Sequence, residues 1–203
     1  MKLYVSPASP FARKTMVAVA ELGLGERVVQ QPTNVTPLTR NDEVASQNPL
    51  VKIPTLITDD GMALFDSPVI CEYLDYLSGT PRLFPAPGPA RWATLRRQAL
   101  GDGLMDATIL IRYETFLRPE ALRWVEWQEG QKRKIDGALD MMEAEVAAMG
   151  DGFDIGHITF GCALGYLDLR FDHFQWRTGR PALAAWFAGV SQRPSMVATL
   201  PRV

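Results

Sequence analysis

Two hydroxyl side chains, Ser6 and Ser9, lie in a short polar turn between an apolar opening segment and a helical pattern that starts at Pro10. Serine is a preferred N-cap and proline is favoured at the first helical position, so Ser9 is predicted to cap a helix. A helix start presents unpaired N–H groups and a partial positive charge. A hydroxyl at that place can donate to an anion such as a thiolate. Ser6 is the alternative donor, and capping alone would also explain Ser9.

A proline lies near the start of the apolar run Ile53–Thr58, which has the pattern of a strand. Proline cannot donate to a β ladder, so one edge of this strand is predicted to stay open. If the Ile53–Pro54 bond were cis, the backbone N–H and C=O of Ile53 would turn outward. An extended peptide could then pair with them as an added strand. A trans proline in a loop is the commoner arrangement.

A second helix start, Asp66-Ser67-Pro68, repeats the arrangement of Ser9-Pro10. Its free N–H groups and the Ser67 hydroxyl are suited to binding a carboxylate. Simple capping is again the alternative interpretation.

These three segments lie in residues 1–78, where strand and helix patterns alternate, and this order predicts an α/β unit with a mixed sheet. The Asp60-Gly61 pair between two apolar runs predicts a hairpin. The expected strands are Lys2–Val5, Arg27–Gln31, Ile53–Thr58 and Met62–Phe65, and the expected helices are Phe11–Leu22, a short one around Leu38–Gln47, and one that starts at Asp66-Ser67-Pro68.

Glycine and proline are concentrated in residues 79–89, which predicts a linker and a domain boundary. Strand patterns are missing after this point, so residues 90–203 are predicted to form an all-α bundle. The expected helices are about Ala90–Leu117, Pro119–Met149, Ile155–Phe174 and Pro181–Val190, with a short tail after Pro194.

Composition narrows the classes of function. The net charge is -2, the pI is near 5.7 and no large cluster of Lys and Arg occurs, which argues against a nucleic-acid partner. Without a signal-peptide pattern or a long apolar run, we expect a cytoplasmic protein with no membrane partner. The two cysteines, Cys71 and Cys162, form no CxxC motif, and His157 and His173 lack the neighbours that a metal site needs.

Taken together, these segments resemble the glutathione S-transferase superfamily, in particular its bacterial serine-type cytosolic members. The segment Ser6–Lys14 looks like the active-site turn of that family, and Asn48–Pro54 is similar to its cis-proline segment. Here Val51 replaces the usual glycine. Phe65–Ser67 resembles the family's acidic–serine pair.

The resemblance extends into the second half of the chain. Residues 153–158 are similar to the capping segment of the family's helical domain, with Asp154 able to cap and His157 in place of the usual aspartate. The resemblance therefore implies a thioredoxin-like N-terminal domain (1–78), a linker (79–89) and an α-helical bundle domain (90–203).

The implied activity is conjugation of glutathione to a small hydrophobic electrophile, which is a detoxification reaction. The resemblance also implies a homodimer that uses glutathione as co-substrate and needs no metal. Ser9 would stabilise the glutathione thiolate. The residues implied to bind glutathione are Ser9, Lys52, Ile53, Pro54, Asp66 and Ser67. Candidates for the electrophile pocket are Phe11, Tyr113 and Phe116. Asp102 and Asp106, one helical turn apart, either face the site across a dimer interface or form a solvated acidic face.

Two other functions stay open at this point. Thiol–disulfide exchange is disfavoured because it needs a cysteine at the position of Ser9. A non-catalytic glutathione-binding stress or regulatory protein of the same fold is the main alternative, since glutathione binding does not prove turnover.

Overall fold

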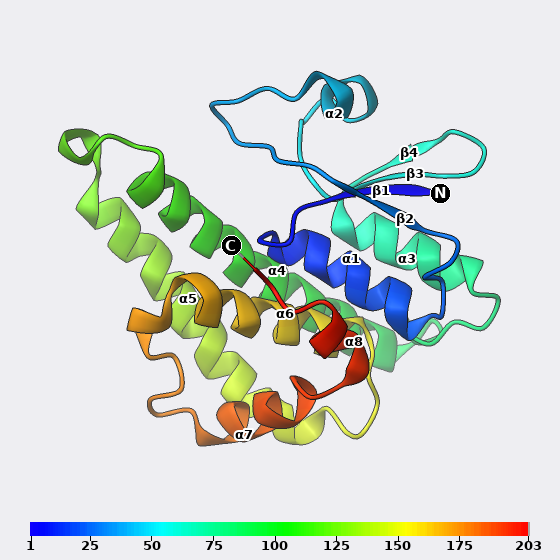
Figure 1. Ribbon diagram of the computed structural model, residues 1–203. Helices are drawn as coiled ribbons and strands as arrows, with labels where there is room; N and C mark the ends of the chain where they lie inside the picture. Colours follow the sequence, from blue (N-terminus) through cyan, green and yellow to red (C-terminus); the bar gives the residue numbers. More distant parts are fainter. Residues whose placement is uncertain (203) are drawn as a thin grey trace.

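One mixed sheet forms in the first third of the chain, in a computed structural model that describes residues 1–202. The strand order is β2-β1-β3-β4, with β1 and β2 parallel and the other neighbours antiparallel. This confirms the predicted mixed sheet (Figure 1). The strands are β1 (Lys2–Val5), β2 (Val29–Pro32), β3 (Thr55–Ile57) and β4 (Ala63–Leu64).

The hairpin between β3 and β4 closes as its Asp-Gly pair predicted. Gly61 adopts a φ of 88°, in the left-handed region that glycine enters at little cost. The Thr58 hydroxyl accepts from the Met62 N–H at 2.9 Å and so fixes the turn.

Helices α1 (Pro10–Glu21) and α3 (Ser67–Leu77) pack against one face of the sheet, and α2 (Asp42–Gln47) lies on the other side (Figure 1). The predicted start of α2 near Leu38 is wrong. Residues Thr36 and Thr39 instead form an isolated β-bridge, and the Asn41 side chain caps α2 by accepting from the Val44 N–H at 3.0 Å.

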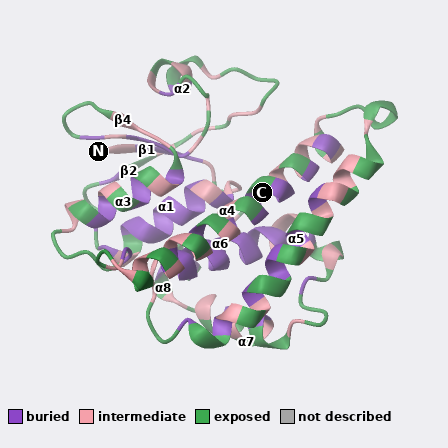
Figure 2. Ribbon diagram, turned by 180° about the vertical axis from the view of Figure 1, so that it is seen from behind, coloured by how far each residue is buried: buried purple, intermediate pink, exposed green. Residues whose placement is uncertain are grey.

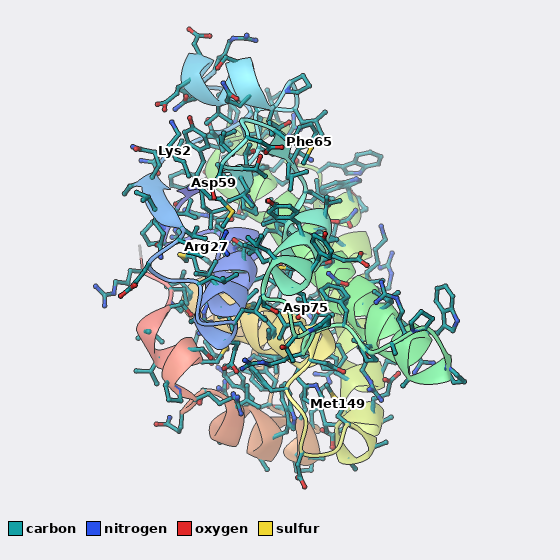
Figure 3. The ribbon with its side chains drawn as sticks, turned by 90° about the vertical axis from the view of Figure 1, so that its right-hand side faces the viewer. Lys2, Arg27, Asp59, Phe65, Asp75 and Met149 are labelled. Atoms are coloured by element: carbon teal, nitrogen blue, oxygen red, sulfur yellow. The ribbon has the colours of Figure 1, made fainter. Side chains whose placement is uncertain are left out.

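The segment after α3 is held by a buried carboxylate, Asp75 (Figure 3). Its two oxygens accept from the backbone N–H groups of Arg82, Leu83 and Phe84 at 2.8–3.1 Å. Because these N–H groups have no partner in a regular element, Asp75 fixes the path of the chain from α3 towards α4.

The rest of the chain is helical, so the overall class is a thioredoxin-like unit followed by an α-helical bundle. Helix α6 is the centre of the bundle: Ile155 to Leu167 are all buried (Figure 2), and α1, α4 and α7 pack against it. None of the helices in residues 1–202 is long and apolar enough to cross a membrane. The helices are α4 (Pro89–Phe116), α5 (Val125–Glu145), α6 (Ile155–Arg170), α7 (Pro181–Val190) and α8 (Pro194–Ala198), with single 3₁₀ turns at Glu120–Leu122, Val146–Ala148 and Asp172–Phe174.

The predicted helix Pro119–Met149 is wrong at its first turn. Arg123 and Trp124 are extended, and the Trp124 N–H donates to the buried Glu114 carboxylate at 2.9 Å, so α5 begins only at Val125. The helix predicted over Ile155–Phe174 is also shorter in the structure, where it ends at Arg170.

A reciprocal capping box starts α6. The Asp154 carboxylate accepts from the His157 N–H at 3.1 Å, while the His157 ring lies 3.4 Å from the Asp154 N–H. Thr94 of α4 donates to the same carboxylate at 2.6 Å. Burial alone would raise the pKa of Asp154, but the hydrogen bonds from His157 and Thr94 lower it below its usual value. His157 thus fills the role of the acidic residue usual in this box.

Two cationic side chains of α1 are buried against the bundle. Lys14 is fully buried and pairs with Asp102 of α4 at 2.6 Å. Arg13 donates to the Met196 carbonyl at 3.1 Å, and its guanidinium fills the space that a side chain on Gly165 of α6 would need. These contacts connect the sheet-containing part of the chain to the bundle.

Candidate functional site

An open pocket with a volume of about 110 Å³ lies between the loop before β3, the start of α3 and one face of α4. The pocket brings together six of the nine residues predicted for the glutathione site and the electrophile pocket: Phe11, Lys52, Ile53, Pro54, Asp66 and Ser67. Ser9, Tyr113 and Phe116 are not among the residues that line it.

The loop before β3 is built around Asn48, which is 1% exposed. Its side-chain amide donates to the Lys52 carbonyl at 3.2 Å and to the Thr55 hydroxyl at 3.0 Å, and its oxygen accepts from the Leu50 N–H at 3.0 Å. These bonds hold the chain that leads into Pro54. Asn48 was not predicted as a site residue, although its place in the Asn-Pro motif was the signal.

The Ile53–Pro54 peptide bond is cis, the arrangement considered less common from the sequence. Within residues 1–202, neither the N–H nor the C=O of Ile53 has a hydrogen-bond partner. The pocket therefore contains an unpaired backbone donor and acceptor, and an extended peptide could bind there by strand addition.

Val51, which occupies the position of the family's usual glycine, adopts a φ of 51°. Positive φ is unfavourable for a β-branched residue, so the loop holds strained backbone beside the pocket. Such strain persists only where surrounding bonds fix the conformation, and here Asn48 accepts from the Val51 N–H through its carbonyl at 2.9 Å.

The start of α3 opens into the same pocket. Ser67 is 1% exposed, and its hydroxyl makes no hydrogen bond to any residue in the described chain. The side chain of Asp66 does not cap the helix and is exposed. The first N–H groups of α3 and the Ser67 hydroxyl are thus free to bind a carboxylate, with Asp66 available for a cationic group beside it.

Ser9 caps α1, as the sequence predicted. Its hydroxyl oxygen accepts from the Ala12 N–H at 3.2 Å, and Pro10 occupies the first helical position. Because the hydroxyl proton has no acceptor within residues 1–202, Ser9 can still donate to a ligand while it caps the helix. Ser6, half-buried in the same turn, holds the Ser9 N–H through its carbonyl at 3.0 Å.

Two carboxylates of α4, Asp102 and Asp106, form the opposite wall of the pocket. They therefore face the site from within one chain, and their spacing of one helical turn was the signal in the sequence. Burial raises the pKa of both groups; Lys14 opposes this for Asp102, and Lys52 opposes it for Asp106.

Tyr113 and Phe116 lie further along α4, beyond Asp106. Tyr113 is half-buried, and burial raises the pKa of its hydroxyl. Phe116 is 64% exposed, and the guanidinium of Arg112 lies 3.8 Å from its ring centre.

Both cysteines are fully buried and unpaired. Burial raises the pKa of Cys71 to about 12 and that of Cys162 to about 11, so both thiols stay protonated at neutral pH. A buried thiol cannot serve as the nucleophile of disulfide exchange. The described residues contain no group of three or more metal-binding side chains.

Comparison with known proteins identifies the family. Residues 8–77 match the glutathione S-transferase N-terminal domain, and residues 125–189 match the C-terminal domain. The chain belongs to the glutathione S-transferase family. The two matches follow the order seen in the fold, with the sheet-containing part first and the helical bundle second.

Several members of the glutathione S-transferase family are similar over their full length. A family member from Pseudomonas fluorescens Pf-5, solved with bound glutathione, is 46% identical, with a TM-score of 0.97 over 100% of this chain and 99% of that one. A second Pseudomonas fluorescens Pf-5 structure, with bound S-(propanoic acid)-glutathione, has the same identity and a TM-score of 0.92, with all of both chains covered. The uncharacterized GST-like protein YibF of Escherichia coli K12 is 32% identical over 99% of this chain and 98% of its own.

Proposed function

We propose that this glutathione S-transferase family member is an active glutathione transferase that stabilises the thiolate of bound glutathione for attack on small hydrophobic electrophiles. The observation that carries the proposal is the pocket in which the unpaired backbone of Ile53 faces the free start of α3. The glutathione and S-(propanoic acid)-glutathione bound in the two similar Pseudomonas fluorescens structures support the same ligand here.

In this proposal glutathione binds as an added strand across the pocket. Its γ-glutamyl carboxylate lies at the start of α3, against the Ser67 hydroxyl, and its ammonium group lies beside Asp66. The backbone of its cysteine pairs with Ile53, while Lys52 and Pro54 border the peptide. Its sulfur then points towards the turn that precedes α1, where Ser9 donates to it.

The expected free energies of these interactions are large enough to ionise the thiol of bound glutathione. A hydrogen bond to a charged group contributes about 1.5–3 kcal/mol, and a helix N-terminus adds about 0.3–1 kcal/mol. At about 1.36 kcal/mol per unit, these contributions lower the thiol pKa by roughly 1.5–3 units from about 8.5. Half or more of the bound glutathione is then ionised at neutral pH. The electrophile would approach from the side of Phe11, with Tyr113 and Phe116 further along α4.

A non-catalytic glutathione-binding protein is the second candidate. One observation favours it: Ser9 is not among the residues that line the pocket. The two candidates differ in one property, since only the enzyme needs the thiol pKa of bound glutathione to be lowered.

Replacing Ser67 by alanine is expected to weaken glutathione binding at least about tenfold, because a charged carboxylate loses one hydrogen-bond donor. Isothermal titration calorimetry measures the affinity. Ser191, at the end of α7 and remote from the pocket, provides a matched control: Ser191→Ala should bind glutathione like the unmodified protein. Equal affinity for Ser67→Ala would remove Ser67 from the site.

We also propose that the protein is a homodimer, as other members of the family led us to expect. Large apolar side chains are exposed on α3 and the start of α4, including Val69, Tyr76 and Trp92, and an interface would cover them. Light scattering should give a mass near twice 22.6 kDa, and Trp92→Glu should reduce it towards that of one chain. A single-chain mass for the unmodified protein would refute the dimer.

A further inference from the structure

Helices α4 and α6 run parallel, and residues at matching levels of the two helices face each other. Near their starts the Thr94 hydroxyl of α4 meets Asp154 at the N-cap of α6. Further along, a Cβ placed on Gly101 would lie 2.7 Å from the Thr159 side chain, so these two positions face each other. Eleven residues, or about three turns, beyond this point lie Arg112 on α4 and Arg170 on α6. The packing therefore brings two arginines to the same level between the helices.

Neither guanidinium has a carboxylate or any other hydrogen-bond acceptor within residues 1–202. The nearby carboxylates have other partners: Glu114 binds Arg118 and the Trp124 N–H, and Asp168 binds Arg177 and the Trp176 ring nitrogen. Both arginines are half-buried. Burial, together with the neighbouring charge of Arg170, lowers the pKa of Arg112 below its usual value. Two like charges held together without a counterion are unfavourable in the free protein.

Two tyrosines accompany the arginines. Tyr166, one turn before Arg170 on α6, is only 5% exposed, yet its hydroxyl has no hydrogen-bond partner in the described chain. Burial raises its pKa to about 12, so the hydroxyl stays neutral and can donate. Tyr113, next to Arg112, also has an unpartnered hydroxyl. Neither hydroxyl oxygen is fully enclosed, so each is open to an acceptor that a ligand carries.

This cluster lies beside the proposed glutathione site. Tyr113 is seven residues after Asp106, which lines the pocket, so both are on the same face of α4 and about 10 Å apart along its axis. A molecule that reacts at the glutathione sulfur could extend along this face of α4 towards the arginines.

Each of the two arginines has a local interaction, but these interactions do not explain why the arginines lie together. Arg112 stacks on the Phe116 ring, and Arg170 is a basic residue in the last turn of α6, where positive charge is favourable. A stacked guanidinium keeps its N–H groups, which lie in its plane, free for a carboxylate. Neither role explains why the two cations and two hydroxyls come together.

We propose that Arg112 and Arg170, with the hydroxyls of Tyr113 and Tyr166, bind a carboxylate carried by the electrophile. The preferred substrates are then electrophiles that bear an acidic group away from the reacting carbon. This rests on the proposed function and narrows its substrate class, since a purely apolar electrophile would leave all four donors unpaired.

The test uses S-alkylglutathiones of several chain lengths, each made in a form that ends in a carboxylate and a form that ends in a methyl group. Calorimetry with the full-length protein should show, at one chain length or more, at least about tenfold tighter binding of the carboxylate form. Arg112→Met and Arg170→Met should each abolish this preference while glutathione itself binds unchanged. Arg133→Met, which alters an exposed arginine of α5, should keep the preference.

The possible failures can be told apart. If the unmodified protein does not bind glutathione, the proposed function itself is wrong. If glutathione binds but no chain length favours the carboxylate, or if both arginine variants keep the preference, the carboxylate site is wrong and the proposed function stands. Unchanged glutathione binding also shows that the variants are folded.

Discussion

Removing the Ser9 hydroxyl is expected to lower kcat/KM for conjugation at pH 7 by about 10- to 150-fold, which corresponds to about 1.5–3 kcal/mol for a hydrogen bond to a charged group. Glutathione affinity should change little, because the tripeptide is held mainly at Ile53 and at the start of α3. The thiol pKa of bound glutathione should rise in parallel with the loss of rate, since both report the same hydrogen bond.

The choice of substitution matters because Ser9 also caps α1 through the Ala12 N–H. Alanine would remove both functions, whereas glycine at an N-cap costs only a few tenths of a kcal/mol. Ser9→Gly therefore isolates the donor, Ser9→Thr keeps both functions, and Ser6→Ala tests the rival hydroxyl. If Ser9→Gly conjugates at the normal rate and Ser6→Ala does not, the donor is Ser6.

Asp102→Ala is expected to destabilise the protein by about 3–5 kcal/mol, because it leaves the fully buried Lys14 ammonium without its partner. Urea unfolding measures the free energy of unfolding. Asp106→Ala is the matched control, since Asp106 lies one turn further on the same wall of the pocket but forms no salt bridge in the described chain. Its effect should stay within about 0.5 kcal/mol.

A double variant separates the lost charge pair from lost packing. Replacing a buried ion pair by apolar residues of similar volume is often neutral, so Lys14→Met with Asp102→Leu should recover most of the stability. If Asp102→Ala is as stable as Asp106→Ala, the ion pair between α1 and α4 does not hold the two parts of the chain together.

Local signals in the sequence were sufficient for several features. The Ser9-Pro10 cap, the Asp60-Gly61 hairpin and the start of α3 each depend on a few neighbouring residues, and each forms as predicted. Helix ends were predicted less well where a distant group decides them. The start of α5 was misplaced because Glu114, ten residues before Trp124, accepts the Trp124 N–H and holds that residue extended.

Features that depend on packing between distant helices were not predictable. The pairing of Lys14 with Asp102 joins residues 88 positions apart, and periodicity alone gives no sign of it. The same is true of Arg112 and Arg170, whose approach follows from the parallel packing of α4 on α6. The six predicted residues in the pocket were found because the family's motifs fix them, whereas Asn48 required the hydrogen bonds of the folded loop.

An ultraviolet difference titration of glutathione with the protein tests the central claim most directly. The thiolate absorbs near the ultraviolet edge of the protein spectrum, so its band can be followed with pH while calorimetry confirms that glutathione is bound. An active transferase of the proposed kind gives a thiolate midpoint roughly 1.5–3 units below the value of about 8.5 for a free thiol. A midpoint that stays near 8.5 with glutathione bound would contradict thiolate stabilisation and favour a non-catalytic glutathione-binding protein.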